Sequence, residues 1–287
     1  MENMTVGKAA DICGGRLWVN AGSGVGAELD FPADKDVPAR DSAVNMTVSG
    51  QIVIDSRQVQ QGDIFVAYHG EKTDGHDYIS AALDRGAACC LAERVPEGET
   101  RPVIVTDDVQ NAVEKLAAAY RKNFELPVIG ITGSVGKTTA KEMISAVLEQ
   151  RFRTLKTEGN LNNRIGVPMI LSRLESGYEA AVIEMGISEF GEMHRLGEIA
   201  KPNVVVMTNI GQCHLKQLKD RQGVYKAKSE VFEHLSDEAT VILNGDDDIL
   251  SGVEEIEGAK VIHFGVNEGN DIRGMGVAAL GLKGIEA

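Results

Sequence analysis

Long apolar runs and a targeting signal are both missing from this sequence of 287 residues. No stretch reaches the length of about 20 apolar residues that a membrane-spanning helix needs. The N-terminus, Met1-Glu2-Asn3-Met4, does not place a basic region before an apolar core, as a secretory signal does. We therefore expect a cytoplasmic chain that does not insert into a membrane.

Positive charge is also scarce. The 29 Lys and Arg residues are outnumbered by 43 Asp and Glu residues, which gives a net charge of −14. Because affinity for nucleic acid depends on clustered Lys and Arg, we expect no nucleic-acid partner. A site for an anionic nucleotide in such a chain must create its own local positive potential.

Cysteines are few and show no paired spacing of the kind that holds a metal. There are four, and Cys89 and Cys90 lie in an apolar run, 87–91, that is typical of a buried strand. We expect reduced, structural thiols. The content of 43% hydrophobic and 25% charged residues is typical of a soluble globular protein, and the length allows two domains.

The first part of the chain, residues 1–106, has the pattern of a small α/β domain. Apolar runs at 52–54, 64–67, 87–91 and 103–105 alternate with polar segments, and a helical pattern covers 78–85. The second part, residues 107–287, opens with a helical pattern from Asp107 to Phe124. We place the domain boundary near Asp107.

Beyond that helix, short β-branched runs alternate with helical patterns. The runs occupy 128–131, 180–183, 204–207, 241–243 and 261–264, and they are continuously apolar, as central parallel strands covered on both faces are. This pattern predicts a doubly wound, mostly parallel sheet of the P-loop type. Polar residues follow several of the runs, at the edge where ligands bind in open α/β sheets.

One of those strand ends carries a glycine-rich turn that indicates a nucleotide-phosphate loop. The turn reads Thr-Gly-Ser-Val-Gly-Lys-Thr-Thr over 132–139 and leads into an amphipathic helix. Glycines turn backbone N–H groups toward an anion, the helix N-terminus adds positive potential, and a lysine supplies a point charge. Ile131 stands where the strict P-loop pattern has glycine, so the match is to the shorter Thr-Gly-x-x-Gly-Lys-Thr variant. The phosphate-binding residues are therefore predicted to be Gly133, Ser134, Val135, Gly136, Lys137, Thr138 and Thr139.

Glu184 ends the run 180–183 and is expected at the same sheet edge as the loop, where a Mg²⁺ ligand belongs. The alternative is a solvated glutamate at a strand end. Pattern alone favours no ligand role for His214, and it favours a solvated helix face for Lys228. The amide-rich loop 157–163 is either a grip for a polar ligand or a turn.

Taken together in this order, these motifs resemble the Mur ligases of bacterial cell-wall synthesis. The resemblance rests on the loop 131–139, the segment 157–168, Ile-Glu-Met-Gly at 183–186, the segment 208–214 and Lys-Ala-Lys at 226–228. Upstream, Asp-Ser-Arg at 55–57 and the segments 62–67 and 74–76 are similar to the family's UDP-binding domain. The Gly-Asn-x-Asn-Asn element at 159–163 favours the branch of the family that adds D-alanyl-D-alanine.

The resemblance implies a role for each matching residue. It implies that Lys137 and the loop hold ATP, that Thr138, Glu184 and His214 bind two Mg²⁺ ions, and that Lys228 is a carbamylated lysine which ligates Mg²⁺. It places Asn244 beside adenine, Asn160, Asn162 and Asn163 beside the muramoyl peptide, and Ser56 and Arg57 beside uridine. A neutral amine that adds CO₂ becomes a carboxylate-like oxygen ligand, which requires a lowered lysine pKa.

The implied activity is an ATP-dependent ligation of D-alanyl-D-alanine to a UDP-N-acetylmuramoyl tripeptide through an acyl phosphate, by a monomer. Residues 1–106 would bind the UDP-linked substrate and residues 107–287 would bind ATP. We expect the chain to lack the family's C-terminal domain and the central sheet to be incomplete, so full activity of these residues is in question. The alternatives are a sibling Mur ligase, a folylpolyglutamate-type ligase, a P-loop ATPase and a catalytically silent nucleotide-binding fragment.

Overall fold

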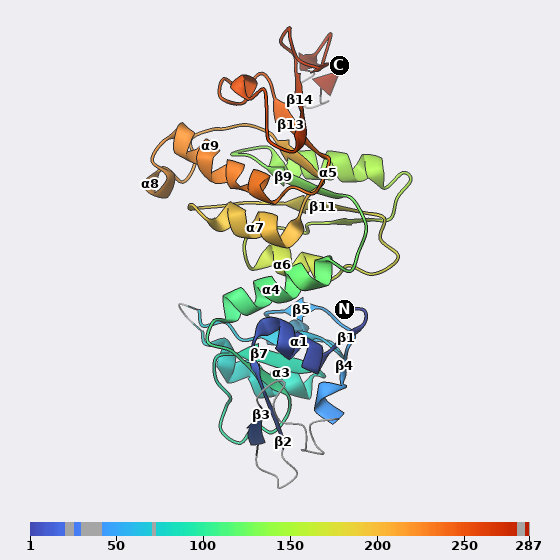
Figure 1. Cartoon of the computed structure of the whole chain (residues 1–287), viewed down its shortest axis with the longest axis vertical. Coiled ribbons are helices and arrows are strands. Elements are labelled where there is room, and N and C mark those ends of the chain that lie inside the picture. Colours follow the sequence, from blue (N-terminus) through green and yellow to red (C-terminus); the bar gives the residue numbers. More distant parts are fainter. Residues whose placement is uncertain (21–25, 30–41, 71–72, 280–284, 287) are drawn as a thin grey trace. The chain divides into compact units, whose positions relative to one another are not determined.

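The computed structural model describes residues 1–20, 26–29, 42–70, 73–279 and 285–286, which form two compact units (Figure 1). Unit 1 comprises Met1–Phe124 and Pro168–Ser176, and unit 2 comprises Glu125–Val167 and Gly177–Ala287. The chain therefore leaves unit 1, enters unit 2, returns for one short segment and goes back. No described helix is long and apolar enough to cross a bilayer.

Unit 1 is built on a six-stranded sheet with the order β3-β2-β8-β7-β6-β5. Strands β5 to β8 are parallel, whereas β2 runs antiparallel to β8 and β3. The strands are β2 (Arg16–Asn20), β3 (Gly26–Leu29), β5 (Ile52–Val53), β6 (Ile64–Val66), β7 (Cys89–Ala92) and β8 (Val103–Val105), and β1 (Met4–Thr5) pairs separately with β4 (Thr47–Val48). The four predicted strands are confirmed. The antiparallel pair β2–β3 was not predicted.

Helices α1 (Val6–Cys13), α3 (Ile79–Asp84) and α4 (Val109–Arg121) and the 3₁₀ turns η1 (Ser56–Gln58) and η2 (Gly75–Tyr78) also lie in this unit. Asp108 caps α4, because its carboxylate accepts from Asn111 N, 2.9 Å away. Leu116 and Tyr120 of α4 are fully buried, and the helix packs on α1.

The division of the chain therefore lies later than the boundary expected at Asp107. The helix 109–121, expected to open the second domain, belongs to unit 1, and the units divide between Phe124 and Glu125. The physical reason is that the apolar face of α4 is buried in unit 1. A periodic pattern shows that a helix has such a face but does not show which core covers it.

Unit 2 contains a seven-stranded parallel sheet with the order β10-β11-β9-β12-β13-β14-β15. The strands are β9 (Val128–Thr132), β10 (Thr154–Lys156), β11 (Ala180–Glu184), β12 (Val204–Met207), β13 (Ala239–Asn244), β14 (Ala259–Gly265) and β15 (Ile272–Arg273). The five predicted strands are all present. The edge strands β10 and β15 were missed, because each is too short to show a pattern. Strand β16 (Ala278–Ala279) pairs separately with β17 (Ile285–Glu286) in an antiparallel two-stranded sheet.

The helices of unit 2 cover both faces of this sheet. They are α5 (Lys137–Leu148), α7 (Glu192–Ala200), α8 (Leu215–Leu218) and α9 (Arg221–Ser229), with 3₁₀ turns η3 (Glu230–His234) and η4 (Leu250–Gly252). Helix α6 (Gly166–Leu171) begins in unit 2 and ends in unit 1. After β9 the chain crosses by α5 to the edge strand β10, then returns through β11 and passes β9 to reach β12. Right-handed crossovers in opposite directions place their helices on opposite faces, and Figure 1 shows α5 and α7 on opposite sides of the sheet.

The carboxyl end of β9 lies where the direction of crossing reverses. In doubly wound sheets this is the place where ligands bind. The predicted doubly wound parallel architecture is confirmed, and it brings the ends of β9, β11, β12 and β13 to one edge.

Candidate active site

The glycine-rich loop connects β9 to α5, as predicted. Gly133 and Gly136 have φ angles of 144° and 82°, which side chains other than hydrogen rarely tolerate. Gly136 occupies the N-cap position of α5, and no side chain caps this helix. The first N–H groups of a helix lack intrahelical partners, so an uncapped N-terminus next to a glycine loop presents donors to an anion.

Contacts to the segment after β12 hold the loop in shape. Ser134 N donates to Asn209 O at 3.1 Å, and Val135 N donates to Asn209 Oδ1 at 3.0 Å. Gly211 N donates to Ser134 Oγ at 2.8 Å. A Cβ added at Gly133 would lie 2.0 Å from Thr208 Oγ1, so the two segments can approach this closely only with glycine there.

Lys137 and Thr138 extend from the first turn of α5. Lys137 Nζ donates to Gly133 O at 2.9 Å, which places the ammonium over the loop. Thr138 Oγ1 donates to Glu184 Oε2 at 3.0 Å. Thr139, the last residue of the predicted loop, is exposed.

Glu184 is the last residue of β11 and is only 2% exposed. Its other carboxylate oxygen, Oε1, accepts from Asn162 Nδ2 at 2.7 Å, and its backbone N–H donates to Thr157 Oγ1 at 2.9 Å. The carboxylate is therefore held between the phosphate loop and the amide-rich loop. This is the position expected for it, and the alternative of a solvated strand-end glutamate is wrong.

Lys228 lies on α9 and is 2% exposed, so the pattern-based expectation of a solvated face is also wrong. Burial lowers the pKa of its ammonium to about 8, and the charge of Lys137 contributes to the same effect, while Cys213 opposes it. A lysine in this environment is neutral far more often than an exposed one. The pKa of Lys228 is thus shifted in the direction that the addition of CO₂ requires.

The amide-rich loop contributes residues of different kinds. Asn162 contacts Glu184, as described above. Asn163 Oδ1 accepts from Gly166 N at 2.9 Å and from Ile165 N at 3.2 Å, so this side chain caps the start of α6. Asn160 is exposed. The structure thus gives Asn163 a structural role beside the ligand role expected of it.

The described contacts of His214 and Asn244 do not connect them directly to Glu184 or Lys228. His214 is exposed at the N-cap of α8, in a left-handed conformation with φ 49°, and among the described residues its ring makes no polar contact with Glu184 or Lys228. Asn244 ends β13, and its Nδ2 donates to Thr208 O at 2.9 Å. Asn244 therefore ties the end of β13 to the end of β12.

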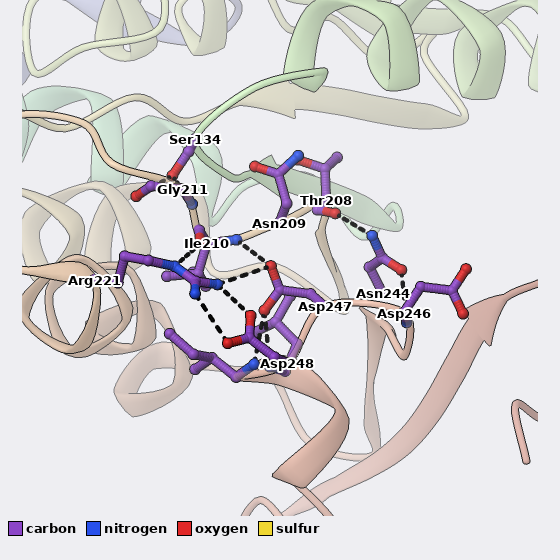
Figure 2. Close-up of polar contacts among 12 residues, drawn as sticks. Ser134, Thr208, Asn209, Ile210, Gly211, Arg221, Asn244, Asp246, Asp247 and Asp248 are labelled. Atoms are coloured by element: carbon purple, nitrogen blue, oxygen red, sulfur yellow. Dashed lines mark hydrogen bonds and ion pairs between the residues drawn. The ribbon is translucent and has the colours of Figure 1, made fainter. Parts of the chain in front are cut away.

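Figure 2 shows a network that fixes the segment after β12 and that the sequence did not reveal. Arg221 Nε donates to Ile210 O at 2.7 Å, and Arg221 pairs with Asp248. Asp247 Oδ2 accepts from Ile210 N at 2.9 Å, while its Oδ1 accepts from Ile249 N at 3.0 Å. Ile210 is thus held on both its backbone groups next to the phosphate loop (Figure 2).

Two other residues that shape the site were missed. Lys141 is 2% exposed, and its Nζ donates to Thr157 O at 2.7 Å and pairs with Glu142 at 2.8 Å. Thr157 is buried and contacts Glu184. The available signals were a lysine one turn after Lys137 on the same helix and a threonine at the start of the amide-rich loop. Neither signal distinguishes a residue of the site from the lysines and threonines elsewhere in the chain.

Ser56 and Arg57 lie in unit 1, in the turn η1 that Asp55 caps. Arg57 is exposed, and its Nη2 contacts Asp55 Oδ2 at 2.8 Å. Arg57 lines a cleft of about 510 Å³, whose other walls are Gln51, Ile52, Val53, Gln58, Val59, Gln60, Met169 and Arg173. The cleft thus has two guanidinium groups, one from η1 and one from the segment that returns to this unit.

The fold and these motifs define a class of protein: the chain belongs to the Mur ligase family. Residues 50–129 match the family model described as the Mur ligase family, catalytic domain, and residues 131–281 match that of the Mur ligase middle domain.

Within the family, the chain is similar to UDP-N-acetylmuramoyl-tripeptide–D-alanyl-D-alanine ligases, called MurF. It is 39% identical to that of Synechocystis, over 78% of this chain and 50% of that protein. It is 40% identical to that of Bacillus subtilis, over 71% of this chain and 45% of that protein. The chain spans about half the length of these curated relatives.

Solved MurF structures resemble this fold. That of Acinetobacter baumannii aligns with a TM-score of 0.81 at 30% identity, over 96% of this chain and 56% of that chain. That of Thermotoga maritima, in complex with ADP, aligns with a TM-score of 0.70 at 35% identity, over 78% of this chain and 52% of that chain.

Proposed function

We propose that this chain carries the UDP-substrate and ATP-binding parts of a ligase that joins D-alanyl-D-alanine to a UDP-N-acetylmuramoyl tripeptide. The observation that carries the proposal is the contact of Thr138 with buried Glu184 at an uncapped glycine-loop helix, with buried Lys228 near Lys137. The substrates are those in the names of its relatives, and the ADP complex of one relative supports the nucleotide.

In the proposed reaction, a terminal carboxylate oxygen of the tripeptide attacks the γ-phosphorus of ATP, and ADP leaves. The amine of D-alanyl-D-alanine then attacks the carbonyl carbon of the resulting acyl phosphate, loses a proton and displaces phosphate. Lys137 and the loop N–H groups bind and orient the phosphates, because charge on the transferring group is best stabilised by fixed donors and cations. Half-buried Lys137 supplies local positive charge in an acidic protein.

The residues present also fit magnesium. Thr138 and Glu184 place a hydroxyl and a carboxylate oxygen side by side, and Mg²⁺ prefers oxygen ligands. We assign Thr138, Glu184, His214 and the carbamate of Lys228 to hold two Mg²⁺ ions, which would neutralise phosphate charge.

The remaining residues are assigned to parts of the substrates according to the unit in which they lie. We propose that the cleft of unit 1, which Arg57 lines, takes the uridine diphosphate end of the substrate, since guanidinium groups suit phosphate, and that Ser56, the neighbour of Arg57 in η1, assists it. Asn160, Asn162 and Asn163 are assigned to the muramoyl peptide, and Asn244 to adenine. We also propose that the protein is a monomer and is located in the cytoplasm.

ADP release tests the reaction, measured with UDP-muramoyl tripeptide and D-alanyl-D-alanine present and with each omitted in turn. We expect ADP only when the tripeptide is present. ADP release that does not depend on the tripeptide would favour the P-loop ATPase, and a free amino acid that replaces the dipeptide as acceptor would favour a sibling ligase.

Calorimetry with ADP and with UDP tests the two binding sites without turnover. A chain that binds both nucleotides but releases no ADP would be the catalytically silent fragment.

A further inference from the structure

A second group of ligand-capable side chains lies on unit 2, where α7 packs on η3. His194 comes from α7, and Glu233 and His234 come from η3. One potential ligand atom from each side chain lies within 4.8 Å of the other two. His194 Nδ1 is 2.7 Å from Glu233 Oε2 and 3.1 Å from His234 Nε2.

Hydrogen bonds among these three side chains cannot satisfy all of their polar atoms. An imidazole nitrogen offers either one N–H or one lone pair, and a carboxylate oxygen only accepts. If His194 Nδ1 carries a proton, Glu233 and His234 compete for it. If Nδ1 is unprotonated, its lone pair faces the carboxylate. One cation placed among the three atoms would satisfy all three lone pairs at once.

The surrounding contacts position the two histidines, whereas the Glu233 side chain is exposed and contacts His194. The Glu230 carboxylate accepts from Gly191 N at 2.9 Å and from His194 N at 3.2 Å, which fixes the start of α7 against η3. A Cβ at Gly197 would lie 3.2 Å from the His234 side chain, so the His234 ring lies directly against the α7 backbone. The His194 and His234 rings meet edge to face with centroids 4.3 Å apart.

We propose that His194, Glu233 and His234 form a binding site for a zinc-class divalent cation. Two imidazole nitrogens and one carboxylate oxygen are a common zinc ligand set that leaves one position for water. Tetrahedral zinc with bonds of about 2.0–2.1 Å places its ligand atoms about 3.3 Å apart, so binding requires the His194–His234 pair to open by about 0.2 Å and the His194–Glu233 pair by about 0.6 Å. Mg²⁺ prefers oxygen ligands, so the site discriminates against the ion assigned to the nucleotide.

The cation would link α7 to the helical segment that carries Lys228, because η3 follows α9 without a break. The linkage is independent of the proposed ligase reaction. Its test therefore needs no turnover.

The test is calorimetric titration of the 287-residue chain with Zn²⁺ in buffer that contains Mg²⁺. We expect one zinc site that Mg²⁺ does not block, and zinc should raise the melting temperature. His194→Ala and His234→Ala should each weaken binding by more than about tenfold, since even the loss of a group that supports a ligand costs that much. Circular dichroism without metal would show that the variants are folded.

Two controls locate the site. His69→Ala removes an exposed histidine of unit 1 and should leave zinc binding unchanged. Cys213→Ser tests a competing thiol in unit 2 and should also leave it unchanged. The proposal is overturned if the parent chain binds no zinc, or if binding survives both histidine substitutions, or if it depends on Cys213 instead.

Discussion

At the scale of single residues, the Lys137 side chain makes few contacts with the rest of the fold. Its Nζ contacts only the loop carbonyl of Gly133 among the described polar groups, and the side chain is half-buried. Glu184 and Lys228 differ from it, since both are buried and their surroundings decide their chemistry.

We predict that Lys137→Ala abolishes measurable binding of an ATP analogue in calorimetry while the thermal unfolding of the chain stays close to that of the parent. The lost ammonium is the one that we assign to phosphate binding, and it is not part of the core. Lys122→Ala, on the surface of unit 1, is the matched control. Equal affinity in a folded Lys137→Ala variant would remove the basis for the phosphate-loop assignment.

Lys228→Ala should lower the rate of the ligase at least about 100-fold, because it removes a metal ligand. Formate or acetate in the buffer should restore part of that rate by occupying the position of the carbamate. Rate measurements with and without the acid decide this. Rescue would not follow from a variant that had only lost stability.

Lys226→Ala is the control for this experiment. Lys226 lies on the same helix but is exposed, so its replacement should change stability by less than about 0.5 kcal/mol and leave the rate alone. Normal turnover of Lys228→Ala in ordinary and CO₂-depleted buffer would refute the carbamate.

At the scale of elements, the phosphate loop depends on the segment that follows β12. Arg221 and Asp247 hold Ile210, and Asn209 and Ser134 join that segment to the loop. The loop's shape is therefore set by contacts from α9 and from the turn after β13 as well as by its own glycines.

Gly133→Ala should weaken ADP binding by at least about tenfold, or about 1.4 kcal/mol. Its φ of 144° and the contact of 2.0 Å with Thr208 Oγ1 both oppose a methyl group. Gly252→Ala is the matched control, because a Cβ there meets nothing within 4 Å. Calorimetry with ADP compares the two, and equal affinities would show that the loop tolerates the displacement.

At the scale of the whole molecule, unit 1 is assembled from two stretches of sequence. Ser172 Oγ accepts from Ile52 N at 3.0 Å, and Tyr120 OH donates to Leu174 O at 2.6 Å, so the returning segment packs into this unit. Helix α4 supplies part of the same core.

We predict that a polypeptide of residues 1–106 does not fold, whereas residues 1–124 form a folded but weakened unit. Burial of Val113 and Leu116 of α4 contributes about 1.5–3 kcal/mol each, and the shorter chain loses both. Circular dichroism during urea unfolding measures this. A cooperative transition in residues 1–106 would show that the division belongs near Asp107 after all.

Unit 1 should also lose stability in acid through Glu99. Hydrogen bonds from the Arg101 guanidinium, at 2.8 Å, lower the pKa of Glu99 to about 2 from an ordinary value of 4.5. A carboxylate whose folded pKa is lowered stabilises the fold above its unfolded pKa, so this contribution is lost as the pH falls from about 4.5 toward 2.

The matching variant is Glu99→Gln, which should cost about 1–3 kcal/mol at pH 7 and flatten the dependence of unfolding free energy on pH in that window. Urea unfolding at a series of pH values measures both effects. An unchanged pH dependence would mean that other carboxylates carry the acid sensitivity.

The sequence by itself determined the features that depend on neighbouring residues. Continuous β-branched runs predicted β9, β11, β12, β13 and β14, and the glycine-rich turn predicted the loop that joins β9 to α5. These predictions succeed because a buried parallel strand and a tight glycine loop each need particular residue types within a few positions.

Only the tertiary structure decided the features that depend on residues far apart in the chain. It buried Lys228, brought Asn162 and Thr138 to the two oxygens of Glu184, moved α4 into unit 1 and placed His194 beside Glu233 and His234. Burial, pKa and metal-ligand geometry are set by whichever elements pack together. A local pattern of charge or periodicity therefore cannot distinguish a helix that is exposed to solvent from one that faces a site.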